Sequence, residues 1–399
     1  MATAGRHANL NVRRSGGGNI VVMRCRLTLS LLLAIASPAL ADETTTRPAG
    51  VGKYEVGTAV YAGDTILLDY YPKQQLVREQ HLPEQSKFPA IDAHCHWSME
   101  QDPEAMLAAM DERNLTHAVN LSGGDSIEEV TAMKERFADD RFVIFCNLDY
   151  SHLGDDDYYR QYLRDAKVAG AKGLKIFKSL GLTVRDAEGR RVSVDDPRLD
   201  AAWETCAELG FPVLIHTGDP AAFFDPVDEH NERWTQLYRH PDWSFSGPEW
   251  PSRQELLHER DRMIAKHPDV NYIGAHVANE AEDLASVAER MKAMPNLYAD
   301  ISGRVAELGR QPYSARRFLL EFQDRVLFGT DRYPGRPDQP RYRRYFEFLE
   351  TDDESFAYHE HDYSPNGEWK IFGVFLPDEV LEKVYRGNAA KLLNLPAAE

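Results

Sequence analysis

The sequence predicts an α/β fold in which eight parallel strands, each followed by a helix, close into a (β/α)8 barrel. Short apolar runs rich in β-branched residues alternate with helix-like segments from Ile91 onward, which is typical of parallel βα units. The 303 residues from Ile91 to Leu393 fall within the roughly 200 to 400 residues of such barrels. Several of the runs end in His, Lys or Asp, and barrel enzymes carry their active-site residues at strand ends.

The strands and helices can be placed in order along the chain. The first strand begins at Ile91, and the others are expected to begin near Thr116, Phe142, Lys172, Phe211, Val270, Asn296 and Arg325. Helix starts are predicted by capping-box patterns at Ser126-Ile-Glu-Glu129 and Ser252-Arg-Gln-Glu255, and by Asp102-Pro103. The spacing of Leu284, Val287 and Met291 predicts a helix stripe that packs on the barrel.

The residues before the barrel divide into two segments, 1–41 and 42–90. A basic start at Met23-Arg-Cys-Arg26, an apolar core from Leu27 to Ala36 and a small-residue site at Ala39-Leu40-Ala41 predict a leader with a signal peptide cleaved near Ala41. The apolar core is too short for a bilayer that needs about 20 residues. We therefore expect an exported protein, periplasmic or secreted, with Met1 or Met23 as its start and no membrane span in the mature chain. Residues 42–90 are predicted to form an arm that packs on the barrel domain, 91–399.

Charge and cysteine content narrow the class of protein. Residues 1–41 contain five arginines and no acidic residue, so the mature chain would carry 41 basic and 64 acidic residues, a net charge of −23. This charge argues against nucleic acid as a partner. Cleavage would leave three cysteines, Cys95, Cys146 and Cys206, and an odd number argues against a disulfide framework.

Two connections are too long for ordinary βα loops of about 2 to 6 residues. They run from Thr217 to Pro251 after the fifth strand and from Arg332 to about Phe375 after the eighth, and both are rich in aromatic residues. Long loops at the carboxyl ends of barrel strands are usually lids or pocket walls. The alternative is that their aromatic side chains form a satellite core.

The pair His94-x-His96 indicates a metal site at the end of the first strand. Alternate side chains of a strand share a face, so Asp92, His94 and His96 are expected to point the same way. Two imidazoles about 7 Å apart along a strand end can converge on one divalent cation. Cys95 alternates with them and is expected to be a buried thiol facing away.

Four later runs end in the same manner, at Lys175, His216, His276 and Asp331. With these residues the chain resembles the amidohydrolase superfamily, in particular the amidohydrolase-related (family 2) branch, and the resemblance extends to the ending Tyr385–Leu393. It implies a divalent ion, zinc by expectation, held by His94, His96, His216 and Asp331. It also implies that Asp331 acts as the general base. His276 is implied either as a ligand of a second ion or as a hydrogen-bond donor to the substrate carbonyl.

Lys175 bears on the number of ions. In two-metal members of the superfamily a strand-four lysine is carboxylated and bridges the ions, and burial lowers the pKa of a lysine as that modification requires. The alternative, which we favour, is that Lys175 pairs with an acidic neighbour or with a substrate carboxylate. Further substrate contacts are predicted at Arg304, Trp97 and Lys178.

These observations predict a metal-dependent hydrolase that cleaves an amide, lactone or related acyl bond of a small molecule, with one or two ions. The main alternative is a decarboxylase acting on an aromatic or unsaturated carboxylic acid, which the same resemblance allows. A binding protein without catalytic activity is a third reading, although it would predict loss of ligands and all are present. A homo-oligomer is compatible with the sequence.

Overall fold

Eight parallel strands build the centre of the protein in the computed structural model, which describes residues 75–336, 341–359 and 364–396. All of them belong to one structural unit, Tyr71–Glu399. The strands are β1 (Ala90–Cys95), β2 (Leu115–Asn120), β3 (Phe142–Cys146), β4 (Gly173–Ile176), β5 (Val213–Ile215), β6 (Tyr272–Gly274), β7 (Leu297–Asp300) and β8 (Val326–Leu327). Each pairs in parallel with the next in sequence. Backbone hydrogen bonds from Ala93 to Phe328 and from Asp331 to His94 join the last strand to the first. The predicted barrel is therefore confirmed, with strand starts close to those expected.

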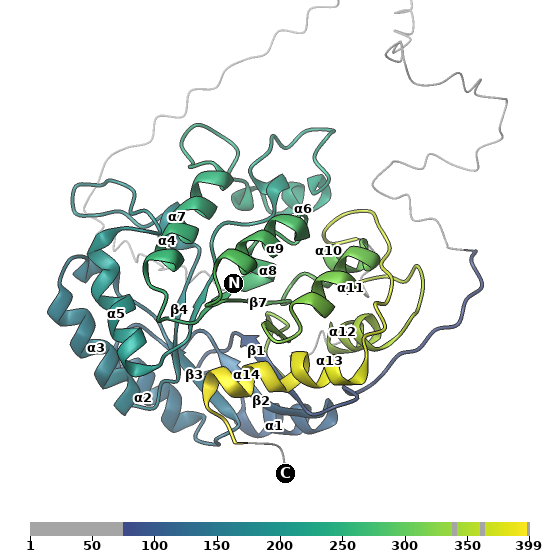
Figure 1. The fold of residues 1–399 in the computed structure, drawn as a ribbon, viewed down its shortest axis with the longest axis horizontal. Coiled ribbons are helices and arrows are strands. Elements are labelled where there is room, and N and C mark those ends of the chain that lie inside the picture. Colours follow the sequence, from purple (N-terminus) through teal and green to yellow (C-terminus); the bar gives the residue numbers. More distant parts are fainter. Residues whose placement is uncertain (1–74, 337–340, 360–363, 397–399) are drawn as a thin grey trace, which may run out of the picture. The chain divides into compact units, whose positions relative to one another are not determined.

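Helices follow the strands and surround them (Figure 1). They are α1 (Pro103–Glu112), α2 (Ile127–Arg136), α3 (Asp156–Val168), α4 (Ser179–Leu182), α5 (Asp200–Leu209), α6 (Trp234–Arg239), α7 (Arg253–Lys266), α8 (Ala275–Ala278), α9 (Leu284–Ala293), α10 (Val305–Gly309), α11 (Pro312–Glu321), α12 (Arg341–Glu350), α13 (Asp378–Glu382) and α14 (Asn388–Leu393). The predicted caps are present, because the side chains of Asp102, Ser126 and Ser252 accept hydrogen bonds from the first turns of α1, α2 and α7.

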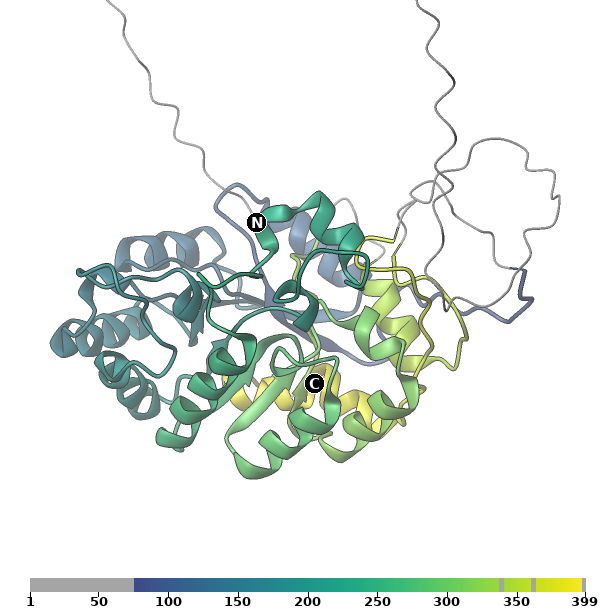
Figure 2. The same ribbon diagram turned by 90° about the horizontal axis from the view of Figure 1, so that it is seen from above.

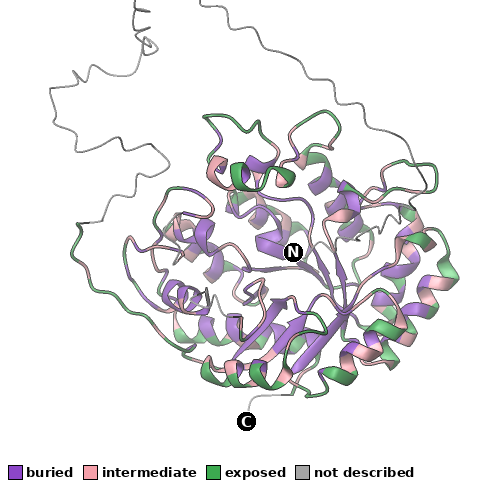
Figure 3. Ribbon diagram, turned by 180° about the vertical axis from the view of Figure 1, so that it is seen from behind, coloured by how far each residue is buried: buried purple, intermediate pink, exposed green. Residues whose placement is uncertain are grey.

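Two apolar layers hold the barrel together. An outer layer lies between strands and helices and includes the predicted α9 stripe of Leu284, Val287 and Met291. A smaller inner layer joins strand residues such as Ile91 and Leu327 to α14. The Asn388 side chain donates to the carbonyl of Val326 at the amino end of β8. Helix α14 therefore packs at the amino ends of the strands, opposite the carboxyl ends near which His94 and Asp331 lie. Seen from above, the helices lie around the central strands (Figure 2). The strands are buried, while the outward sides of the helices are exposed (Figure 3).

The predicted signal peptide and most of the predicted arm lie outside the described residues. Within the described part of the arm, His81 donates its backbone N–H to Asp353 and Lys87 donates to Glu350. These bonds tie the residues just before β1 to α12 and the segment after it. Among the described residues, no helix is long and apolar enough to cross a bilayer.

Candidate metal centre

The end of β1 carries the two histidines on an irregular strand. Asp92 is in register with Ala118 of β2, but Cys95 is in register with Asn120, so β1 has one residue more than its neighbour here. This bulge changes the alternation that the sequence predicts. His94 contacts Asp300, Ser302 and the His276 ring, whereas Asp92 bonds to Thr330 and Tyr342. The expectation that Asp92 shares a face with the histidines is therefore wrong.

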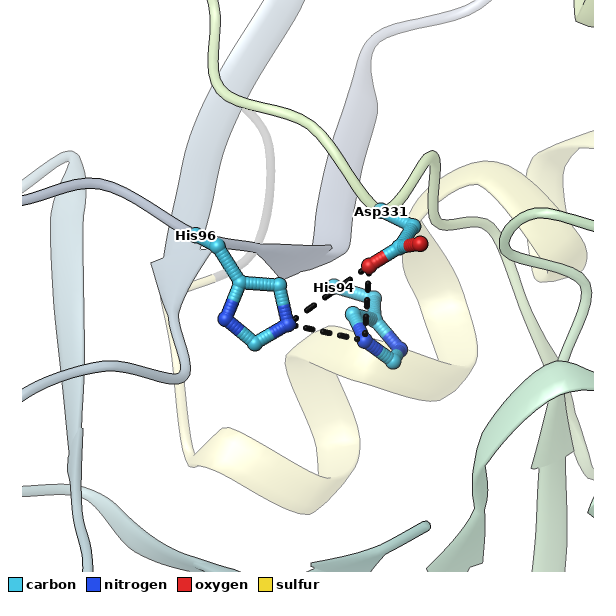
Figure 4. Close-up of side chains that lie close together, drawn as sticks. All are labelled: His94, His96 and Asp331. Atoms are coloured by element: carbon cyan, nitrogen blue, oxygen red, sulfur yellow. Dashed lines mark hydrogen bonds and ion pairs between the residues drawn. The ribbon is translucent and has the colours of Figure 1, made fainter. Parts of the chain in front are cut away.

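Three donor atoms, from His94 in β1, from His96 directly after it and from Asp331 after β8, converge on one another (Figure 4). The Nε2 atoms of His94 and His96 are 3.3 Å apart, and the Asp331 Oδ1 atom lies 3.5 Å from the first and 3.6 Å from the second. Ligands bound at 2.0–2.2 Å in a tetrahedral zinc site are separated by about 3.3 to 3.6 Å. The spacing of these atoms thus fits a single divalent ion.

Protonation of the imidazoles also fits metal binding. Nδ1 of His94 lies 2.8 Å from Asp300 Oδ2, and because a carboxylate only accepts, Nδ1 carries the hydrogen and Nε2 keeps its lone pair. Burial lowers the pKa of His94 well below its ordinary value, and the charge of Lys175 adds to this effect. Burial likewise lowers the pKa of His96 to about 4. Both rings are therefore neutral near pH 7, as a metal ligand must be.

Asp92 fixes the backbone on which these ligands stand. Its buried carboxylate accepts hydrogen bonds from the backbone N–H of His94 and Thr330, from the Thr330 hydroxyl, and from Tyr342 of α12 at 2.6 Å. Burial raises the pKa of Asp92 to about 6, against the opposing effect of the Thr330 and Tyr342 bonds. Gly329 lets β8 approach, because a Cβ there would lie 2.9 Å from the His94 Cβ. Asp331 follows in the left-handed region, at φ 63°, which Asp tolerates.

The histidines after β5 and β6 lie beside this trio. The His276 ring is 4.8 Å from the His94 ring and 4.5 Å from the His216 ring, measured between centroids. Nδ1 of His276 is 2.7 Å from the carbonyl oxygen of Ser302, so Nδ1 is the donor, and burial keeps the pKa of this ring well below its ordinary value. Its Nε2 then offers a lone pair, which favours a ligand or acceptor over a donor to a substrate carbonyl.

His216 is turned toward a neighbouring carboxylate. Its Nε2 lies 3.6 Å from Asp219 Oδ1 and has no hydrogen-bond partner among the described residues. Among the described residues, three groups of His and carboxylate donors have ligand atoms within 4.8 Å of one another, and two of these groups are at this site: His94 with His96 and Asp331, and His94 with His276 and Asp300. His216 belongs to neither group. The structure therefore brings together three of the four expected ligands and leaves the fourth beside them.

Lys175 points into the same region from β4. Its side chain is 1% exposed, its Nζ lies 5.4 Å from the centre of the Phe177 ring, and no described residue hydrogen-bonds to it. Burial lowers the pKa of Lys175 to about 8, against the raising effect of Asp300 and Asp331. The expected pairing with an acidic neighbour is not formed. An unpartnered buried ammonium is costly, which points to a ligand or a modification that completes it.

The predicted substrate residues have different surroundings. Lys178 is paired with the buried Asp219, at 2.5 Å, and lies over the Phe245 ring. Although burial acts to raise it, the Lys178 charge and His216 hold the pKa of Asp219 below its ordinary value. Arg304 donates to the carbonyl of Gly303 and lies close enough to His276 to depress the pKa of that ring.

Trp97 does not fit a substrate role. It is 3% exposed, and its ring packs between Phe137 and Phe142, 5.6 Å from each. Beyond the bulge, alternation resumes and turns Trp97 to the outer layer, away from His94 and His96. Cys95 faces the same layer, and all three described cysteines are buried and free. Aromatic residues of the two long loops, including Phe223, Trp243 and Tyr345, also pack against the outer core, so they extend the main core and do not form a separate satellite core.

Two carboxylates important to the site were not assigned from the sequence. Asp300, the last residue of β7, is fully buried and accepts from His94 Nδ1, the His276 backbone N–H and the Ser302 hydroxyl. Asp219 lies between Lys178 and His216. Asp300 ends a strand as Asp331 follows one, a signal that could have identified it. Nothing in the sequence places Asp219 near His216 except its spacing of three residues.

Comparisons with known proteins give the family to which the chain belongs. No curated protein matches the sequence. Solved structures with a similar chain path include an uncharacterised TIM-barrel protein from Bordetella bronchiseptica, with 17% identity, 76% of this chain and 98% of that chain covered and a TM-score of 0.48. A dihydroxybenzoic acid decarboxylase from a Polaromonas species, solved with manganese and 2-nitroresorcinol, shows 16% identity, 78% and 98% coverage and a TM-score of 0.49. A probable 2-pyrone-4,6-dicarboxylic acid hydrolase from Acinetobacter baumannii shows 11% identity, 77% and 100% coverage and a TM-score of 0.46.

A family model gives the assignment. The model described as amidohydrolase matches residues 117–395, which include most of β2, all of β3 to β8 and the site residues from Lys175 to Asp331. The family is one of metal-dependent enzymes, and the convergence of His94, His96 and Asp331 supplies a possible metal site. This chain belongs to the amidohydrolase family.

Proposed function

We propose that this protein is a metal-dependent hydrolase that cleaves an amide, lactone or related acyl bond of a small molecule. The observation that carries the proposal is the position of Asp331. Its carboxylate lies within 3.6 Å of both imidazole Nε2 atoms, yet its side chain is 39% exposed. The other carboxylates around His94, Asp92 and Asp300, are fully buried. A group that exchanges protons with water must reach water, and Asp331 does so.

His94, His96 and Asp331 would hold the ion, for which we propose zinc, with His216 beside them as a further ligand. A bound divalent ion supplies Lewis acidity, which lowers the pKa of water toward 7 and polarises a carbonyl. Asp331 takes the proton of the attacking water as a new C–O bond forms at the acyl carbon. It then gives that proton to the leaving nitrogen or oxygen as the acyl bond breaks.

The buried side of the site would hold the substrate. Lys175 Nζ lacks a hydrogen-bond partner among the described residues, and Arg304 lies near His276. Two cations beside the reaction centre favour a substrate with a negatively charged or strongly polar group. His276, with Nδ1 held by Ser302, presents its other nitrogen either to a second ion or to the substrate.

Turnover of zinc-loaded protein on a panel of small amides, lactones and aromatic carboxylic acids in ¹⁸O-labelled water tests this function. We expect one ¹⁸O atom in the product acid and no carbon dioxide. Asp331→Asn, which keeps an oxygen ligand but cannot take a proton, should lower kcat by at least about 100-fold, while Cys95→Ser leaves it unchanged. Release of carbon dioxide from an aromatic acid, with no acyl cleavage, would instead establish a decarboxylase.

We also propose that the protein is exported, on the basis of the apolar run from Leu27 to Ala36, which lies outside the described residues. N-terminal sequencing of protein from its native host should begin at or near Asp42. An intact leader on protein recovered from the cytoplasm would refute this proposal.

A further inference from the structure

The segment after β6 has an uncommon backbone. His276 and Val277 lie in the left-handed helical region, at φ 58° and ψ 47° and at φ 59° and ψ 51°. Ala278 follows at φ 50° and Asn279 at φ 61°. All four are non-glycine residues and at most 3% exposed. L-residues rarely adopt this conformation and then mostly singly, so four in succession persist only if the surroundings hold them there.

The surroundings hold the turn at both ends. At its start, the His276 N–H donates to Asp300, 2.9 Å away. Near its end, the fully buried Arg260 of α7 donates to the carbonyl of Ala278. The turn also packs closely on its own strand, because a Cβ on Gly274 would lie 2.8 Å from the Cα of Ala278. The position of the His276 ring therefore depends on how the whole turn is fixed.

Asn279, the last residue of the turn, connects it to the neighbouring strand end. Its Oδ1 accepts the backbone N–H of Thr217 at 2.9 Å, and Thr217 directly follows His216. Arg253 reinforces the connection, since its guanidinium donates to the carbonyl of Asn279 at 2.5 Å and to that of Asp219 at 3.1 Å. The backbone after His216 and the backbone after His276 are thus joined at two points, directly beside two imidazoles whose centroids are 4.5 Å apart.

We propose that Asn279 is a positioning residue, which holds the His216 and His276 rings against each other by accepting the Thr217 N–H from a left-handed backbone. Asn suits this position for two reasons. It tolerates the left-handed region better than most residues, and its amide oxygen reaches a backbone donor. Asn279 touches neither ring in this account and acts only through the two backbones. Arg253 supports the same connection from α7.

Three variants of the full-length chain distinguish the effect of the left-handed backbone at residue 279 from the effect of the Asn279 side-chain oxygen. Asn279→Gly keeps a relaxed left-handed backbone but loses the acceptor for Thr217. Asn279→Asp keeps both the acceptor and the tolerance of that region. Asn394→Gly is the matched control, because Asn394 is also left-handed, at φ 51°, but lies at the end of α14, outside the site.

Two readouts report on the rings without a substrate. The first is the long-range ¹H–¹⁵N spectrum of the histidine rings, and the second is the zinc Kd from chelator competition. In Asn279→Gly we expect the His216 and His276 resonances to move and zinc affinity to fall about 10- to 100-fold, as for other residues that orient metal ligands. The thermal midpoint should stay close to that of Asn394→Gly. Asn279→Asp should restore both the ring spectrum and the affinity.

Unmoved ring resonances together with wild-type zinc affinity in Asn279→Gly would overturn the proposal. It would equally fail if Asn279→Asp were as impaired as the glycine variant, since the acceptor oxygen would then be irrelevant. Should the glycine variant not fold, Arg253→Met carries the same test, with moved ring resonances expected and unmoved ones contradicting it. That the two rings serve catalysis rests on the proposed function. Because neither readout needs turnover, failure of the hydrolase assay would be distinguishable from failure of this inference.

Discussion

The two halves of the site differ in how completely the protein itself assembles them. On the β1 and β8 side, the Nε2 atoms of His94 and His96 and the Oδ1 atom of Asp331 lie 3.3 to 3.6 Å apart. The Asp92 carboxylate links the two backbones by accepting the N–H groups of His94 and Thr330. On the β4 to β6 side, Lys175 Nζ and His216 Nε2 are buried and lack hydrogen-bond partners among the described residues. Buried polar atoms without partners are unfavourable. From this difference we propose that the first half holds an ion, while the second half is completed by the ligand that binds there.

Loss of a ligand on the assembled side should have the largest effect. Because residues that merely orient a ligand contribute about 10- to 100-fold to metal affinity, His94→Ala should weaken zinc binding by more than about 100-fold and abolish turnover with it. Cys95→Ser, one residue away on the opposite face, should leave both largely intact. The measurement is metal content after dialysis against a weak chelator. Full metal content in His94→Ala would contradict the ligand assignment.

Variants at Asp92 test whether the protein itself fixes the β1 and β8 side of the site before an ion binds. Asp92→Ala leaves the buried N–H groups of His94 and Thr330 and the Tyr342 hydroxyl without their acceptor, so we expect a loss of about 3 kcal/mol in the free energy of unfolding. Tyr342→Phe removes one bond and should cost about 1 kcal/mol. Denaturant unfolding of the metal-free proteins gives both values. Equal small losses would mean that Asp92 does not organise the ligand backbones.

A variant at Lys175 tests the β4 to β6 side of the site. If it binds the substrate, Lys175→Met should leave the number of bound ions unaltered and raise KM, by about tenfold for a charge-assisted hydrogen bond. If it were carboxylated and bridging, the same change would remove one of two ions, with partial rescue by small carboxylic acids. Elemental analysis of the variant distinguishes the two. We expect the first result, and loss of half the metal would reverse this assignment.

The smallest effect is expected in the turn after β6. Ala278→Gly should change the free energy of unfolding by less than about 0.5 kcal/mol, because relief of a left-handed alanine, about 1 to 2 kcal/mol, offsets the entropy and buried methyl lost. Ala166→Gly, at a residue equally buried in the right-handed helix α3, should cost about 1 kcal/mol or more. Comparable losses from the two variants would show that the turn is not strained.

The sequence predicts the fold better than the details of the site. Strand starts and helix caps are local, and Phe142, Ser126 and Ser252 take the predicted roles. The placement of Asp92 depends on a bulge at the end of β1, and a bulge leaves the hydrophobic pattern around it unchanged. Trp97 follows the ordinary alternation after His96, which turns its side chain away from the site. The turn at His276 is left-handed only because distant groups such as Asp300 and Arg260 hold it. Contacts of this kind appear only when the chain is folded.

The central claim is that His94, His96 and Asp331 hold a divalent ion at the end of β1 and β8. Anomalous diffraction from crystals of the zinc-loaded protein, recorded on both sides of the zinc absorption edge, locates and counts the ions directly. We predict one strong peak about 2.0 to 2.2 Å from His94 Nε2, His96 Nε2 and a carboxylate oxygen of Asp331. A peak bound elsewhere, or no peak at these three residues at full zinc occupancy, would contradict the claim.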